Sequence, residues 1–370
     1  MILSKKIIEE IIKYKSDLYK SFTSNSKYNF DIKKFKKFKT IVIIGMGGSI
    51  LGTKAIYSFL KHKIKKNFIF IDNLDSHYLL KVKKENNLNK ALFLIISKSG
   101  NTNETIVNSS YFRPFFKKQN LIIISEYKEN ILSNFAKANK TNFVIHNKNI
   151  GGRYSIFSEV SMLPSFLMGL KEKNFKKNIP HIIKNKKILS QSVKQISKIN
   201  FNKTKAIVFL NYIPELTNFL YWCQQLMAES LGKNKKGLMP VISTAPKDHH
   251  SLLQLYLDGP KDKLFYVFSS ENKSKLKINT KFFGSKVKYL NKKKYERVKL
   301  SQKNAFISVL KEKKIPFREI TIKKFDEKTL GKLFFLFIFE TIVFSKILKV
   351  NPYDQPGVER VKILTKKILS

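Results

Sequence analysis

The segment from residue 41 to residue 52, I-V-I-I-G-M-G-G-S-I-L-G, constrains the fold more than any other. Its first four residues are β-branched without polar alternation, which is typical of a parallel strand covered on both faces. Gly45, Gly47 and Gly48 let backbone N–H groups approach a bound group, and Ser49 stands where a helix begins. The order predicts a strand, an anion-binding loop and a helix. The alternative is a tight turn capped by Ser49, because short glycine clusters are weak signals of binding.

Further apolar segments of strand length alternate with segments of helix length. They lie at residues 68–71, 92–96, 121–124 and 143–145, and again at 206–210, 238–242 and 264–268. This alternation predicts an α/β fold with two parallel sheets wrapped by helices. No low-complexity linker separates the two halves, so we expect them to pack closely and to share a cleft.

The chain is strongly basic, with 72 Lys+Arg against 26 Asp+Glu and a net charge of +46. Such a charge ordinarily suggests nucleic acid or an anionic membrane as a partner. The lysines are scattered from end to end, however, and arginine, which reads base edges, is scarce. We therefore expect solvated lysines on the outer faces and no specific nucleic-acid partner.

Three features favour the cytoplasm. Cys223 is the only cysteine, which excludes an internal disulfide and fits a reducing compartment. Glu9 and Glu10 interrupt the N-terminal apolar residues, so we expect no secretory signal. The most apolar stretch, residues 333–344, is short and contains Glu340, which predicts a buried helix and no membrane partner.

A second polar loop follows the strand at 92–96. Its sequence, S-K-S-G-N-T-N-E-T from residue 97, supplies Ser97, Ser99 and Thr102 just where a helix begins. Two such loops at one edge of a sheet favour a phosphorylated ligand, because ligands of open α/β sheets lie beyond the carboxyl ends of the strands. Hydroxyl-rich turns are also common as helix caps, which is the alternative interpretation.

Four further residues are candidates for chemistry. Arg153 follows two glycines and offers a rigid planar fork, although a structural ion pair would also explain it. Glu229 precedes a glycine break, but a lone helix glutamate is usually solvated. His249 and His250 are adjacent and no second cluster has ligand spacing, so we predict no metal site.

The order of these segments is more specific than any one of them. G-M-G-G-S, S-K-S-G-N-T-N-E-T, G-G-R-Y-S, A-E-S-L-G-K, D-H-H-S-L-L-Q-L with D-G-P, and Y-D-Q-P-G-V-E-R-V-K occur in this order. Over about residues 40 to 365 the chain resembles the glucose-6-phosphate isomerase (phosphoglucose isomerase) family in its short bacterial form.

The resemblance implies two flavodoxin-like sugar isomerase (SIS) domains. With it we expect an N-terminal helical arm at residues 1–39, a first SIS domain at 40–175, a second at 176–350, and a C-terminal helical tail at 351–370 that completes the site. It implies reversible conversion of glucose 6-phosphate to fructose 6-phosphate, a step of glycolysis and gluconeogenesis, without a cofactor. A homodimer with shared active sites is also implied.

The resemblance also assigns site residues, position by position. It implies that Glu229 is the base at C2, that His250 opens the ring together with Lys362, that Arg153 faces the intermediate, and that Gln355 belongs to the site. The His250 of one subunit would serve the site of the other. The phosphate would be bound by Gly47, Gly48, Ser49, Ser97, Lys98, Ser99 and Thr102.

Four positions depart from the family pattern. His249 replaces a usual Gln, which leaves open which histidine acts, and Ser99 replaces a usual Thr but keeps the hydroxyl. Ser161 replaces a common Gly, and Glu159 adds a charge near the arginine. A related isomerase that also accepts mannose 6-phosphate and a non-catalytic sugar-phosphate sensor remain alternatives; a sensor would be free to lose the acid–base groups, all of which are present.

Overall fold

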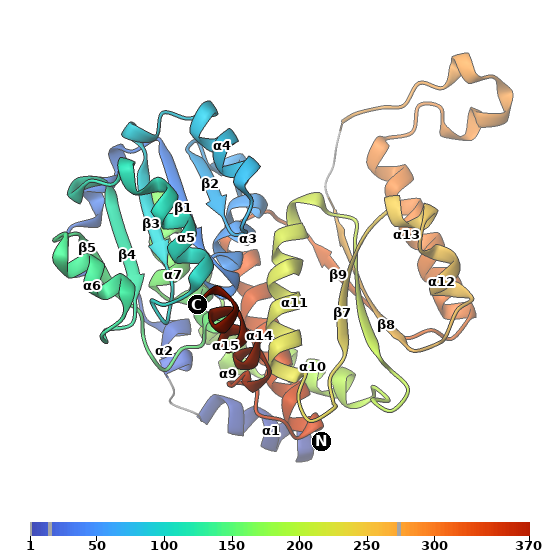
Figure 1. Cartoon of the computed structure of the whole chain (residues 1–370). Helices are drawn as coiled ribbons and strands as arrows, with labels where there is room; N and C mark the ends of the chain where they lie inside the picture. The colour runs from blue at the N-terminus through green and yellow to red at the C-terminus, as the bar shows by residue number, and fades with distance from the viewer. Residues whose placement is uncertain (1, 14–16, 272–274) are drawn as a thin grey trace.

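The computed structural model describes residues 2–13, 17–271 and 275–370, and it contains two parallel sheets (Figure 1). The first sheet has the strand order β2-β1-β3-β4-β5, the flavodoxin-like order. Its strands are β1 (Thr40–Gly45), β2 (Asn67–Ile71), β3 (Leu92–Ile96), β4 (Leu121–Ser125) and β5 (Asn142–Ile145). β1, β3 and β4 are buried almost throughout, as their unbroken apolar sequences predict.

The second sheet has the order β7-β6-β8-β9 and is also parallel. Its strands are β6 (Ala206–Asn211), β7 (Met239–Thr244), β8 (Lys263–Ser270) and β9 (Phe317–Ile322). The predicted α/β class with two parallel sheets is confirmed. β9 was not predicted, because it is an edge strand whose sequence, F-R-E-I-T-I, alternates polar and apolar residues and buries only its last residue fully.

Helices connect and cover the strands. They are α1 (Ile2–Lys13), α2 (Asp17–Thr23), α3 (Leu51–Phe59), α4 (Ser76–Glu85), α5 (Asn103–Phe112), α6 (Ile131–Ala138), α7 (Glu159–Leu167), α8 (Glu172–Lys176), α9 (Ile179–Asn185), α10 (Lys187–Ser197), α11 (Thr217–Leu231), α12 (Leu253–Leu257), α13 (Tyr295–Glu312), α14 (Glu327–Leu348) and α15 (Glu359–Leu369). Ile7 and Ile8 of α1 are buried, and α1 contacts α10 and α14. The exact domain boundaries at residues 39, 175 and 350 stay predictions.

α14 is the buried helix expected from its apolar sequence. It lies between the two sheets together with α11 (Figure 1), and Phe334 packs edge-on against Trp222 of α11 with 4.8 Å between ring centroids. The buried carboxylate of Glu340 accepts hydrogen bonds from Ser192 Oγ of α10 at 2.6 Å and from Arg318 Nη1 of β9 at 2.7 Å. One apolar core therefore runs from the first sheet through α14 and α11 to the second sheet.

Across the described ranges, no helix combines the length and the apolar character needed to cross a lipid bilayer. Buried charges such as Glu340 interrupt even the most apolar segment.

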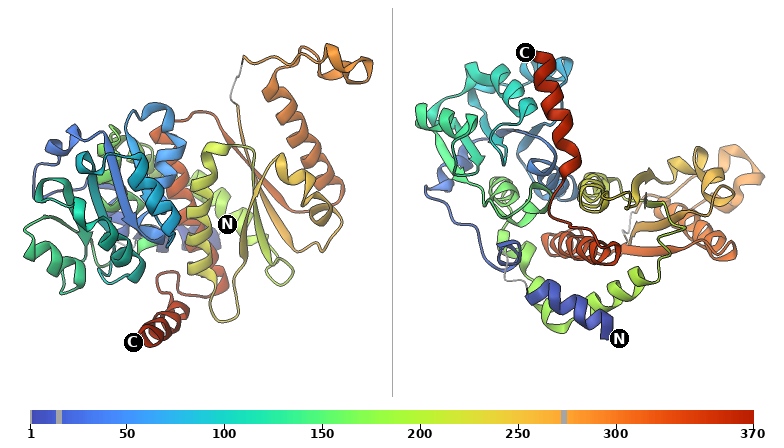
Figure 2. Two further views of the ribbon diagram at one scale, coloured as in Figure 1. Left: turned by 45° about the horizontal axis from the view of Figure 1, so that its top comes forward. Right: turned by 60° about the horizontal axis from the view of Figure 1, so that its bottom comes forward.

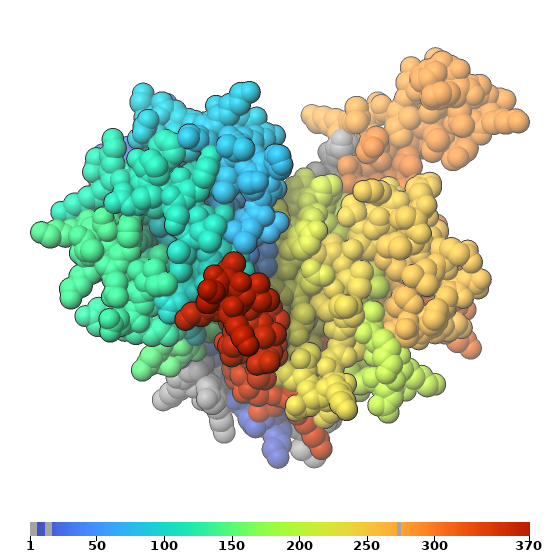
Figure 3. All heavy atoms as spheres, viewed as in Figure 1, coloured from blue at the N-terminus to red at the C-terminus, as the bar shows by residue number. Residues whose placement is uncertain are grey.

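The C-terminal helix α15 differs from the others because every one of its residues is exposed. It extends from the body of the molecule (Figure 2) and lies on the front face between the two halves (Figure 3). Val361, Leu364 and Ile368 recur at helical spacing and form an uncovered apolar stripe.

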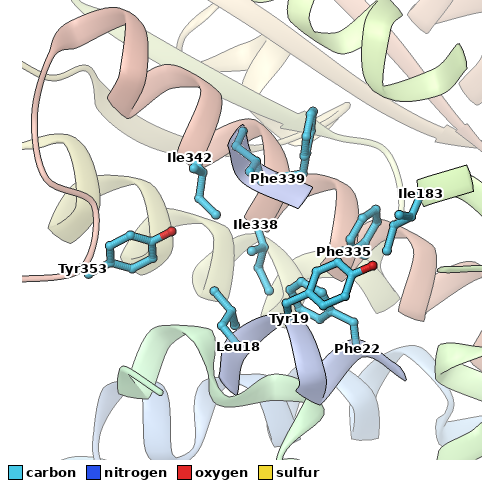
Figure 4. Close-up of a pocket in the computed structure, with 10 residues that line it drawn as sticks. Leu18, Tyr19, Phe22, Ile183, Phe335, Ile338, Phe339, Ile342 and Tyr353 are labelled. Carbon is cyan, nitrogen blue, oxygen red and sulfur yellow. The ribbon is translucent and has the colours of Figure 1, made fainter. Parts of the chain in front are cut away.

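A small cavity of about 30 Å³ lies beneath the turn that precedes α15 (Figure 4). It is lined almost entirely by apolar side chains of α1, α2, α9 and α14, with Tyr353 at one side. A cavity of this size can hold molecules such as water but is too small for a sugar phosphate.

Candidate active site

The two predicted phosphate loops meet at one edge of the first sheet. β1 and β3 are neighbours, and their last residues, Gly45 and Ile96, are paired in register. The loop after β1 forms a short 3-10 turn, Gly47–Ser49, and α3 begins only at Leu51. Ile50 occupies the N-cap, so the alternative in which Ser49 merely caps the helix is wrong.

Position 48 must be glycine because the backbone of Gly152 leaves no room for a side chain. A Cβ on Gly48 would lie 2.2 Å from the carbonyl carbon of Gly152, so the first phosphate loop and the loop that carries Arg153 touch through their backbones. Gly47 has φ +50° and lies against Gln225 of α11, where a Cβ would be 2.6 Å from Nε2. These glycines join three segments of the site.

Hydroxyl groups brace the second loop from within. Ser97 is buried, and its Oγ lies 2.9 Å from Thr102 Oγ1 and accepts a hydrogen bond from Gly100 N at 3.2 Å. Ser99 is exposed, and its Oγ accepts a hydrogen bond from Asn101 N at 3.3 Å. The loop is thus shaped before any ligand arrives.

Lys98 connects this loop to the loop of Arg153. Its Nζ donates to Lys148 O at 2.8 Å and lies 3.6 Å from the carboxylate of Glu126. Burial lowers the pKa of Lys98, and the charge of Glu126 opposes that shift.

Arg153 is the centre of the site. Only 3% of it is exposed, in the 3-10 turn Gly152–Phe157. Its Nε donates to Ser230 Oγ at 2.9 Å, and its NH1 donates to Glu229 Oε2 at 3.1 Å and to Gln355 Oε1 at 2.7 Å. Its NH2 donates to the carbonyls of Pro352 at 2.6 Å and Asp354 at 3.0 Å. Such a set of partners matches the planar fork of arginine.

Three of the predicted catalytic residues, Arg153, Glu229 and Gln355, are therefore in direct contact although they lie far apart in the sequence. Glu229 is in the last turn of α11, and its Oε1 accepts from Gln225 Nε2 at 2.9 Å. Its side chain remains 31% exposed, so a ligand can reach the carboxylate.

Sequence reasoning missed the residues that hold the tail. The side chain of Lys233 is 9% exposed; its Nζ lies 2.8 Å from Asp354 Oδ1 and also donates to Asn351 O and Ser230 O. This bond holds the pKa of Asp354 below its usual value. Tyr154 OH lies 2.8 Å from Ser230 Oγ and donates to Pro352 O at 3.0 Å. Lys233 is the last residue of the motif A-E-S-L-G-K, and its place in that motif is the sequence feature from which it could have been found.

His250 lies far from this cluster within one chain. It is exposed, in the turn Lys247–His250 at the carboxyl edge of the second sheet. α11 begins near that same edge, after β6, and runs back over about 18 Å from Thr217 to Glu229, where Glu229 meets Arg153. Among the described residues, no hydrogen bond or ion pair joins His250 to Arg153, Glu229 or Gln355.

His249 has a structural environment of its own. Its Nε2 lies 2.8 Å from Tyr212 OH, and its ring packs on Phe306 with 5.6 Å between centroids. Burial lowers its pKa. Of the two histidines, His250 is the one that is open to solvent.

Lys362 also lies outside the cluster. It is on α15, its side chain is 64% exposed, and its Nζ pairs with Glu359 of the same helix at 2.7 Å. As for metals, the described part of the chain contains no group of three or more His, Cys, Asp or Glu side chains that could bind an ion.

Comparison with known proteins identifies the family of the chain. The sequence profile described as phosphoglucose isomerase matches residues 3–370. The chain is 33% identical over 351 residues to the glucose-6-phosphate isomerase of Methanocaldococcus jannaschii, covering 90% of this chain and 86% of that protein.

Two crystal structures share the fold. A hypothetical protein from Thermus thermophilus superposes with a TM-score of 0.87 at 23% identity, covering 100% of this chain and 95% of that one. A glucose-6-phosphate isomerase from Chlamydia trachomatis superposes with a TM-score of 0.73 at 20% identity, covering 99% of this chain and 73% of that one. With a family profile that matches almost every residue, the chain belongs to the phosphoglucose isomerase family.

Proposed function

We propose that the protein interconverts glucose 6-phosphate and fructose 6-phosphate through ring opening and a cis-enediol intermediate. The observation that carries this proposal is the convergence of Arg153, Glu229 and Gln355 at the sheet edge where two hydroxyl-rich loops meet. Membership of the family supports the same activity.

The phosphate would be bound by the loops after β1 and β3. Backbone N–H groups of Gly47 and Gly48 and the hydroxyls of Ser49, Ser99 and Thr102 lie at this edge, near the N-termini of α3 and α5. Ser97 is buried, and Lys98 donates a hydrogen bond to Lys148 O, which suits these two residues to shaping the second loop.

Glu229 would transfer the proton. In the open-chain aldose its carboxylate takes the proton from C2, and the electron pair left behind forms a C1–C2 double bond. The electron pair of the C1 carbonyl moves to O1 at the same time, and O1 takes up a proton to give the enediol. The carboxylic acid then returns the proton to C1 while the O2 hydroxyl proton leaves, which gives the ketose. One carbon is reduced and its neighbour is oxidised in the same molecule, so the reaction needs no external redox cofactor.

Arg153 would stabilise the negative charge that develops on the enediolate oxygens. Its guanidinium is held by Ser230 and by the carbonyls of Pro352 and Asp354, so it does not need to reorganise as the charge grows. One such preorganised donor contributes about 3 to 4 kcal/mol in other enzymes. Gln355, which accepts a hydrogen bond from the same NH1, would orient substrate hydroxyls.

Ring opening would involve a second copy of the chain. His250 lies in the turn after β7, near the edge of the sheet where α11 begins, whereas Glu229 is in the last turn of α11. His250 would therefore enter the site of a partner in a homodimer. Lys362, exposed on α15, would share the proton transfer at the ring oxygen once the tail is packed. We place this enzyme in the cytoplasm, where the buried thiol of Cys223 remains reduced.

The test is turnover of fructose 6-phosphate by the purified, chelator-treated protein, followed through formation of glucose 6-phosphate with a coupled dehydrogenase. We expect metal-independent turnover with fructose 6-phosphate. Mannose 6-phosphate as a parallel substrate would report whether C2 stereochemistry is discriminated. Absence of turnover, with fructose 6-phosphate still raising the melting temperature, would contradict the proposal and favour a sensor.

A further inference from the structure

The segment that carries Arg153, residues 147–158, is closed at its base by one buried pair. We call this segment the arginine loop. His146 stands at its start, directly after β5, and Glu159 at its end, as the first residue of α7. His146 Nδ1 lies 2.7 Å from Glu159 Oε1, with side-chain exposures of 2% and 14%.

We propose that the His146–Glu159 pair latches the arginine loop and is a positioning element for Arg153. This inference rests on the proposed function, in which Arg153 acts on the intermediate. In the described part of the chain, no hydrogen bond or ion pair joins His146 or Glu159 to Arg153, Glu229 or Gln355, so the pair acts through the loop that it closes.

Both halves of the latch are fixed to rigid elements. The backbone N of His146 donates to Ser125 O of β4 at 2.7 Å, which extends the sheet by one residue. Glu159 begins α7, where Ser158 caps the helix through Val160 N. A bond between two rigid elements fixes the span of the loop between them, whereas a bond within a loop would move with it.

The arginine loop is in tight contact with its neighbours, so it cannot move without changing the site. Gly152 touches the backbone of Gly48, and Trp222 Nε1 donates to Arg153 O at 3.1 Å. A shift of the loop therefore moves the guanidinium relative to Glu229 and relative to the phosphate loop at once. Misplacement by about 1 Å can cost a hundredfold in rate.

Stability alone is a poor explanation of the pair. His146 Nε2 is buried and has no hydrogen-bond partner among the described residues, which carries a desolvation cost. An apolar side chain would avoid that cost. The histidine also brings a carboxylate, Glu159, into a nearly buried position, where an unpaired charge would be unfavourable.

The protein contains its own reporter of the loop. Trp222 is the only tryptophan of the chain, it is 1% exposed, and its indole N–H bonds the Arg153 carbonyl. Loss of that bond and entry of water would shift its fluorescence to longer wavelength. This readout does not depend on any enzymatic activity.

The experiment compares H146F, which keeps an aromatic ring but removes the bond, with H146N, whose side-chain amide can donate from about the position of Nδ1. For H146F we expect a red-shifted Trp222 emission and a kcat for fructose 6-phosphate lower by about tenfold or more, with KM changed by less than about threefold. For H146N we expect the wild-type emission and most of kcat to return.

Two controls distinguish an effect of the latch on the arginine loop from a general loss of stability. N120A removes hydrogen bonds of a buried side chain at the opposite edge of the same sheet, and it should lower the melting temperature while leaving kcat and Trp222 emission unchanged. In an R153Q background, H146F should cost little further activity, because the two changes act through one group.

The inference fails if H146F leaves emission and kcat at wild-type values, or if N120A changes them as much. Full additivity of H146F and R153Q would also overturn it. If instead R153Q keeps full turnover, the proposed role of Arg153 is wrong, while the emission of H146F still decides whether the pair holds the loop.

Discussion

At the scale of single residues, the site depends on the geometry of one guanidinium. Arg153 donates hydrogen bonds to the end of α11 and to the tail, including two main-chain carbonyls of the tail. A buried carbonyl that loses its donor pays a desolvation cost. The same side chain therefore stabilises the tail and, in our proposal, the intermediate.

We predict that R153K is a severe change although it keeps the charge. A lysine presents one nitrogen and cannot span Ser230, Glu229 and the carbonyl of Pro352 together. We expect kcat to fall by about 10²- to 10³-fold, the range for loss of one preorganised donor, with a lower melting temperature. Steady-state kinetics and calorimetry measure both. A kcat near the wild-type value would contradict the role given to Arg153.

Single residues also mark how far sequence reasoning reaches. Arg153, Glu229 and Gln355 stand in short motifs, and their types matched the expected chemistry. Lys233 and Ser230 were missed because their importance depends on contacts with a tail that is distant in the sequence, which no local pattern reveals. The latch of His146 and Glu159 was missed for a related reason: the notable feature is the 2.7 Å distance, and only folding creates it.

At the scale of elements, the site is made of loops that touch through their backbones. The strands could be predicted because short unbroken apolar runs are typical of strands that are buried on both faces, and every predicted strand is present. β9 could not, since an exposed edge strand has the alternation of a surface segment. The contact between the loop of Gly48 and the loop of Gly152 likewise follows from the fold and not from either loop alone.

We predict that G48A separates these two loops. Its Cβ would lie 2.2 Å from the backbone of Gly152, which cannot yield as a side chain would. The protein should lose about 1 to 3 kcal/mol of unfolding free energy and most of its turnover. G151A is the matched control, since its nearest neighbour would be Tyr154 Cδ2 at 3.4 Å, an ordinary contact. Equal denaturation midpoints and equal turnover for the two variants would show that the loops can separate without cost.

We predict a pH signature for the element that carries Gln355. The pKa of Asp354 is lowered by its bond to Lys233, so its contribution to stability is present above its usual pKa of 3.8 and is lost as the pH falls through the lower, folded value. D354N should therefore melt below the wild type at pH 7, and the gap should close in acid. Melting curves from pH 7 to about pH 3 would measure it. A gap that is constant with pH would exclude the ion pair as its cause.

At the scale of the whole molecule, α11 determines which groups can meet. It carries Glu229 from the second sheet to the loops of the first, while His250 stays at the opposite edge of the second sheet. A single chain thus brings Glu229 and Arg153 together but leaves His250 outside. This separation supports the proposed homodimer, which the resemblance to the family also implies.

We predict that two inactive variants restore activity when mixed. E229Q and H250A should each lose turnover alone. After unfolding and refolding together, a mixed dimer has one site with both groups intact, so the equimolar mixture should regain about a quarter of wild-type turnover if the subunits pair at random. Light scattering would establish the dimer independently. A mixture that stays inactive, despite dimers, would place His250 and Glu229 in the same chain's site.

The contact between Glu229 of α11 and Arg153 bears on how such a chain can be divided. Arg153 precedes and Glu229 follows the largely exposed segment at residues 198–205, which joins α10 to β6. A protein cut within that segment would give two fragments, each with a whole sheet and neither with a whole catalytic group set. Turnover would return only when the fragments reassociate, which makes the two halves partners in folding as well as in chemistry.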